Sequence, residues 1–141
     1  MSVLNLATAN RIIEGAFEHA EKLQLKPLTV AVLDAGGHVI ALQRQDGSSI
    51  ARAQIAIGKA AGALALGVSS RKIAEMAVER PTFINALAPL APAGIIPAAG
   101  GVVVVGAEGR TAGAVGVTGD LSDNDESCAL AGLAAVRLAA L

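Results

Sequence analysis

Two cations of this sequence, Lys59 and Arg44, could hold an anionic ligand. Lys59 falls in the middle of Ser49–Leu66, a stretch that is apolar around most of a helix. An isolated buried charge costs several kcal/mol, so Lys59 should face an acid, a ligand anion or a partner subunit. With a depressed pKa it could act as a base or a Schiff-base amine, and a structural salt bridge is the alternative. Arg44 could clamp a ligand carboxylate bidentately, or pair with Asp46.

Acids and glycines near the C-terminal end form a second group of candidates. Asp125 and Glu126 could transfer protons to or from a substrate. Acids in the first turn of a helix are also explained by capping and by the helix dipole, so we expect no metal here. Gly100 and Gly101 precede a run of valines and would let the backbone approach a ligand closely, although paired glycines before a strand are also common connections.

The sequence has two histidines, and they differ in position. His19 lies at the border between the apolar and charged faces of a helix predicted over Asn5–Gln24. There it could ligate a haem iron or titrate near neutral pH, or simply be a surface residue. His38 lies at the tip of a predicted hairpin, where it should be exposed, and no catalytic role is expected for it.

Hydrophobic periodicity and turn residues predict the elements that position these side chains. We predict strands over Leu28–Leu33, Val39–Leu42, Val102–Val105 and Thr111–Thr118, and helices over Asn5–Gln24, Ser49–Leu66, Ser70–Glu79 and Asp123–Ala140. Thr82–Ala88 should form a short helical turn, and Pro89 to Gly101 an irregular apolar loop. Asp46, Ser48 or Ser49 could cap the second helix. Ser122 and Asp125 resemble a capping box at the start of the last one.

One face of the predicted strand Thr111–Thr118 is nearly bare. Its side chains alternate between two faces, and one face carries only Ala112, Ala114, Gly116 and Thr118. Something can therefore approach this backbone closely, whether a helix, a neighbouring subunit or a flat ligand.

Composition limits the class of protein. The length of 141 residues predicts a single domain over 1–141. A net charge of −1 and 1% aromatic residues argue against nucleic-acid binding. With 53% apolar and 16% charged residues, the chain should hide surface against copies of itself, an Ala-rich monomer being the alternative.

Cysteine content and the lack of membrane signals suggest a location. Cys128 is the single cysteine, which excludes an internal disulfide and a multi-Cys metal site. No signal peptide is visible, and prolines and glycines interrupt the uncharged stretch 81–107, so we expect no membrane span and a cytoplasmic protein.

Three segments of the chain resemble one known family. LTVAVLDAGGHVIALQRQDGSSIARAQIAIGKAAGAL, the GG before the valine strand, and GAVGVTGDLSDNDESCALAGLAAV are similar to the GlcG/HbpS-like family, which includes the C-terminal domain of PduO-type adenosyltransferases. The resemblance implies an α/β domain of the α+β type with an antiparallel sheet of four to five strands flanked by helices. The implied order is α-β-β-α-α-β-β-α, profilin/roadblock-like. It also implies higher oligomers, such as octamers, and haem or tetrapyrrole binding, in some members haem degradation.

Two functions from different classes remain open. The first is a homo-oligomeric binding protein whose subunit interfaces hold haem or another tetrapyrrole, with His19 as the axial ligand. The second is a cofactor-independent enzyme, a lyase, isomerase or hydrolase, with its site at a subunit interface. In that enzyme Arg44 and Lys59 would hold an anionic small-molecule substrate, with Gly100 and Gly101 beside it, and Asp125 or Glu126 would transfer the proton. A purely structural subunit is a third possibility.

Overall fold

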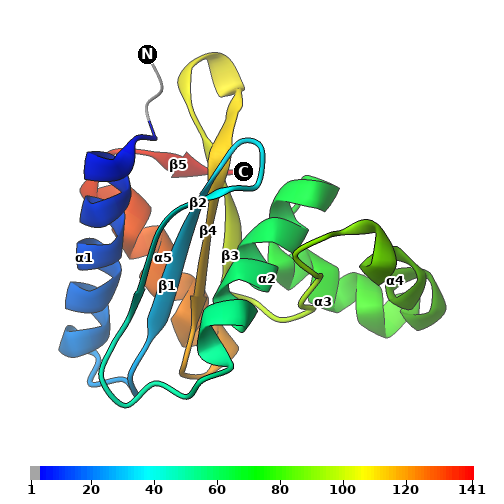
Figure 1. Cartoon of the computed structure of the whole chain (residues 1–141), viewed down its shortest axis with the longest axis horizontal. Helices are drawn as coiled ribbons and strands as arrows, with labels where there is room; N and C mark the ends of the chain where they lie inside the picture. The colour runs from blue at the N-terminus through cyan, green and yellow to red at the C-terminus, as the bar shows by residue number, and fades with distance from the viewer. Residues whose placement is uncertain (1–3) are drawn as a thin grey trace.

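A five-stranded antiparallel sheet with helices on both faces organises the chain (Figure 1). The computed structural model describes residues 4–141. Its elements are α1 (Leu6–Lys22), β1 (Thr29–Asp34), β2 (Val39–Arg44), α2 (Arg52–Leu66), α3 (Ser70–Glu79), α4 (Pro81–Leu87), η1 (Ala88–Leu90), β3 (Gly101–Val105), η2 (Ala107–Gly109), β4 (Thr111–Thr118), α5 (Ser122–Ala135) and β5 (Ala139–Ala140). The strand order is β2-β1-β4-β3-β5. The predicted α+β architecture is confirmed.

The larger core lies between the sheet and the pair α1 and α5. Alternate strand residues point to this side, and they are almost all valines because β-branched side chains pack well on a pleated surface. The fully or nearly fully buried residues here include Ile12, Ile13, Val30, Val32, Val102, Val104, Val115, Val117 and Leu133. Glycines bring α1 and α5 together: a Cβ on Gly132 would meet the backbone of Ile12.

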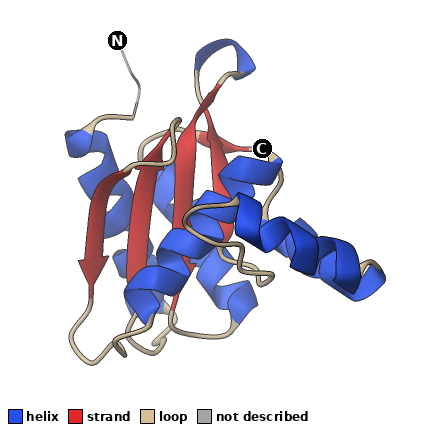
Figure 2. Cartoon of the chain, turned by 45° about the vertical axis from the view of Figure 1, so that its right-hand side comes forward, coloured by secondary structure: helices blue, strands red, loops and turns tan. Residues whose placement is uncertain are grey.

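The opposite face of the sheet is covered by α2, which lies directly on β4 (Figure 2). This is the nearly bare face that the sequence predicts, and a helix is what approaches it. Ala112 is the exception: beside an irregularity in the β3–β4 pairing, it packs against the core on the other side of the sheet. A Cβ on Gly116 would overlap the carbonyl oxygen of Ala56, and one on Gly101 would overlap that of Lys59. The close approach of α2 therefore depends on glycines in β3 and β4, which have no side chain to keep the helix away.

A helical arm formed by α3 and α4 extends from the side of the molecule (Figure 1). Ser69 caps α3, since its side chain accepts a hydrogen bond from the Lys72 N–H at 3.2 Å. After η1 the chain returns over the outer side of α2, where Gly58 and Gly62 face Ile96 and Ile95. The predicted apolar loop thus closes over the helix that carries Lys59.

Two predicted helix boundaries are wrong by three residues or more. The last helix ends at Ala135, not Ala140: Arg137 adopts φ +59°, and Ala139 and Ala140 pair with β3. Backbone pairing at the sheet edge thus replaces the last turn of helix. The second helix begins at Arg52 rather than Ser49, and no side chain caps it.

The predicted caps have other partners. Ser48 Oγ accepts a hydrogen bond from Thr29 Oγ1 at 3.1 Å and lies 3.5 Å from the Pro27 carbonyl oxygen, to which it donates. Ser122 is the first residue of α5, with Leu121 at the N-cap position and no side-chain cap there. Asp125 reaches back instead to the Asp120 N–H, at 3.0 Å.

In the part of the chain that the structure describes, we find no helix with the length and apolar character needed to cross a membrane.

Candidate functional site

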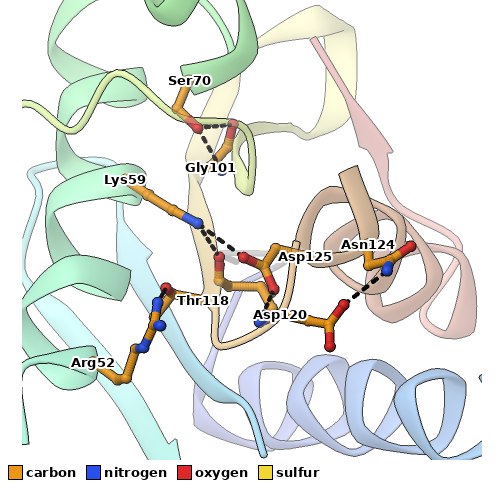
Figure 3. Close-up of polar contacts among 9 residues, drawn as sticks. Arg52, Lys59, Ser70, Gly101, Thr118, Asp120, Asn124 and Asp125 are labelled. Carbon is orange, nitrogen blue, oxygen red and sulfur yellow. Dashed lines mark hydrogen bonds and ion pairs between the residues drawn. The ribbon is translucent and has the colours of Figure 1, made fainter. Parts of the chain in front are cut away.

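A buried ion pair joins α2 to α5 at one end of the sheet (Figure 3). Lys59 Nζ lies 3.1 Å from Asp125 Oδ2 and donates a second hydrogen bond to the Val117 carbonyl oxygen at 3.0 Å. The Lys59 and Asp125 side chains are only 3% and 1% exposed. Of the partners the sequence allows for Lys59, the structure thus supplies an acid of the same chain.

Burial dominates the electrostatics of this pair. Loss of hydration lowers the pKa of Lys59 and raises the pKa of Asp125, while their mutual attraction opposes both changes. Asp125 has no spare oxygen, because its Oδ1 accepts the Asp120 N–H. Asp120 in turn is hydrogen-bonded by the Asn124 side chain at 2.7 Å, which lowers the pKa of Asp120. The result is a closed polar network.

Arginines lie at the same end of the sheet but do not join this pair. Arg52 Nη1 donates to Thr118 Oγ1 at 2.7 Å. Arg44 Nη1 donates to the Ser48 carbonyl oxygen at 3.2 Å, and among the described residues Arg44 forms no ion pair with Asp46. Arg44 instead borders an open depression of about 560 Å³, which is lined by Phe17, Leu25, Pro27, Gln43, Arg44, Gln45 and Asp46.

Of the remaining candidates from the C-terminal half, Glu126 lies apart from Lys59, whereas Gly100 and Gly101 lie beside it. Glu126 accepts hydrogen bonds from Arg71 Nε at 3.0 and 3.1 Å, so it links α5 to α3 on the surface. Gly100 and Gly101 are buried, and the Gly101 N–H donates to Ser70 Oγ at 2.7 Å. Both glycines lie close to Lys59.

His19 lies where α1 meets α5, half-buried. Its Nε2 is 2.8 Å from Ser127 Oγ. Leu23, one turn along α1, is 46% exposed, and Leu130, about one turn along α5 from Ser127, is 43% exposed. His19 thus lies on an outward-facing surface with exposed apolar side chains near it.

A cavity that the sequence did not predict lies beside His38. The cavity has a volume of about 430 Å³ and lies between the β1–β2 turn, the second half of α2 and the chain that follows η1. It combines residues that are far apart in sequence, so no local pattern reveals it. The one available signal was the Asp-Ala-Gly-Gly-His turn, which places an imidazole at the tip.

Cys128 is fully buried in the core, and burial raises the pKa of its thiol to about 11. Because the thiolate is the reactive form, we expect iodoacetamide to label the native protein at least about 100-fold more slowly than the urea-unfolded protein. Mass spectrometry of timed samples measures both rates. Equal rates would contradict the burial of this thiol.

Comparison with protein families places almost the whole chain in one group. The family described as "Haem degrading protein HbpS-like" matches residues 4–134. Among curated proteins, none matches the chain in sequence.

Solved structures share the fold. A crystal structure of HbpS has a TM-score of 0.80 and 30% identity, and the alignment covers 93% of this chain and 88% of that one. The protein ORFY of Klebsiella pneumoniae has a TM-score of 0.84 and 25% identity, with 95% and 90% covered. A complex of PduOC with haem has a TM-score of 0.84 and 21% identity, with 96% of each chain covered.

Proposed function

Because this chain belongs to the HbpS-like family of haem-degrading proteins, we propose that it binds haem or a related tetrapyrrole, with His19 as the axial ligand of the iron. The observation that carries the assignment to His19 is its contact with Ser127. Haem bound there would supply an iron centre open to further ligands or to electron transfer.

The chemistry of the available donors fits an iron ligand at His19. Iron-ligating histidines commonly donate their second ring N–H to a nearby acceptor, which fixes the ring and its tautomer. When His19 Nε2 is the protonated nitrogen, Ser127 Oγ is that acceptor at 2.8 Å, and Nδ1 keeps its lone pair. Cys128 is unsuited because it is buried as a neutral thiol, and the sequence has no tyrosine.

The surface around His19 suits a flat apolar ligand. Leu23 and Leu130 expose apolar side chains on the two helices that meet there. A porphyrin laid on this open surface would leave its other face in water, and a second copy of the chain would cover it. We therefore place the haem between copies of a homo-oligomer, which we take to be a cytoplasmic octamer.

The enzymatic alternative has less support. It requires Lys59 and an acid around an open cavity, whereas Lys59 and Asp125 are closed to solvent and Glu126 is held by Arg71. Arg44 borders a depression without Lys59. The arrangement therefore favours a binding protein over acid–base catalysis at these residues.

Titration of the purified protein with haemin tests the proposal. We expect a shifted Soret band, and at least about tenfold weaker haem binding in His19→Ala, because loss of a ligand should cost no less than loss of an outer hydrogen bond. Ser127→Ala should weaken binding to a smaller degree. The matched control is His38→Ala, which removes the other histidine and should bind haem as the unmodified chain does.

An unchanged haemin spectrum at micromolar protein would refute haem binding, and a spectrum lost in His38→Ala but kept in His19→Ala would refute the ligand assignment. Sedimentation velocity with and without haemin tests the oligomer separately. A 14.0 kDa particle under both conditions would contradict an interface site.

A further inference from the structure

We propose that the cavity beside His38 is a second binding site, which takes a small apolar molecule carrying one hydroxyl group, with the His38 imidazole as hydrogen-bond acceptor. The site does not depend on haem binding. It lies at the β1–β2 turn and α2, away from the surface where α1 meets α5 (Figure 1).

The His38 ring lies against its own turn, with Nδ1 beside a carboxylate. Asp34 Oδ1 accepts hydrogen bonds from the backbone N–H groups of Gly36 and His38 at 2.9 and 3.0 Å, and lies 3.4 Å from His38 Nδ1. The hydrogen bond from the His38 N–H has the largest effect on the pKa of Asp34, and together these bonds hold that pKa below its usual range. The carboxylate therefore stays ionised. The ring packs over the Cα of Gly36, where a side chain would contact it.

This arrangement indicates which ring nitrogen can accept a hydrogen bond from a ligand. A neutral imidazole whose Nδ1–H faces a carboxylate carries its lone pair on Nε2. Within residues 4–141 no hydrogen bond to His38 Nε2 is present, and the side chain is 82% exposed. Asp34 adds a negative charge beside the ring, which disfavours an anionic ligand. A neutral hydroxyl group that donates to Nε2 fits best.

The cavity walls require that the rest of the ligand be apolar. Ala61, Leu64 and Ala65 of α2 form one wall, and Leu90, Ala91 and Pro92 form another. Three N–H groups of the turn are already bonded: those of Gly36 and His38 to Asp34 Oδ1 and that of Gly37 to the Asp34 carbonyl oxygen. His38 is the sole titratable side chain of the lining, and about 430 Å³ is within the range of small-molecule sites.

Two probes that differ in one O–H group test this directly. 4-Ethylphenol has an apolar body and a hydroxyl donor, and 4-ethylanisole is the same molecule with the hydroxyl methylated. In titrations followed by NMR we expect amide shifts at Ala61, Leu64 and Leu90 with both probes. The phenol should bind about 3- to 10-fold more tightly, which corresponds to one net hydrogen bond.

His38→Ala should remove that difference and leave the weaker, apolar binding of both probes. Ala65→Leu, which keeps His38 but fills the cavity, should weaken both. His19→Ala is the control outside the cavity and should change neither titration, whatever it does to haem binding. Equal affinities for phenol and ether, shifts elsewhere in the molecule, or a phenol preference that survives His38→Ala would each overturn the proposal.

Discussion

Replacing Lys59 by methionine should lower the free energy of unfolding by about 3–5 kcal/mol, because it leaves the Asp125 carboxylate buried without its cation. Methionine fills a similar volume, so lost packing adds little. Asp125 is 1% exposed and cannot turn to water. Urea unfolding followed by circular dichroism measures the change.

The double variant Lys59→Met/Asp125→Asn separates the charge from the packing. An amide at position 125 can still accept the Asp120 N–H and carries no charge, so the double variant should be more stable than Lys59→Met alone.

The stability of Lys59→Met should also depend on pH. Because burial already raises the pKa of Asp125, the folded state binds a proton more readily than the unfolded one. Stability of Lys59→Met should therefore rise as the pH falls toward that raised pKa. Equal losses in the single and double variants would contradict an unpaired charge as the cause.

Replacing Gly116 by alanine should destabilise the protein by about 3 kcal/mol, near the upper limit for overpacking. The added methyl group would overlap the carbonyl oxygen of Ala56, which belongs to the backbone of α2 and cannot rotate away. The helix would have to move off the sheet, and Lys59 with it. Thermal and urea unfolding measure the loss.

Gly36→Ala is the matched control for that variant. Gly36 lies outside the left-handed region, and its added methyl group would meet the ring of His38, a side chain that can move. We expect a change of less than about 1 kcal/mol there, as is usual for surface sites. A Gly116→Ala protein as stable as Gly36→Ala would show that α2 does not depend on the bare strand.

Sequence patterns that extend over only a few residues predicted most of the helices and strands. The alternation of valines, the glycine after α2 and the serine before α3 each act over a few residues, which is the range that periodicity and capping describe. The end of α5 could not be predicted in the same way. Residues 136–140 suit a helix, but pairing of Ala140 with Val104 depends on where β3 lies.

The sequence predicted that Lys59 needs a partner, but it did not predict which residue that partner is. An apolar helix around Lys59 implies a partner, but an acid of the same chain was one choice among several. The partner, Asp125, is 66 residues away and is brought there by β4 and α5. The cavity at His38 could not be predicted, because one of its walls is the loop that returns over α2. Gly58 and Gly62 make room for this loop, but their role is visible only in the folded chain.

The short strand β5 has a consequence for handling the protein. Its residues Ala139 and Ala140 pair with Val105 and Val104, and the Leu141 N–H donates to the Val103 carbonyl oxygen at 2.9 Å. Without these three residues the edge of β3, a strand of one glycine and four valines, would be exposed as a template for intermolecular aggregation.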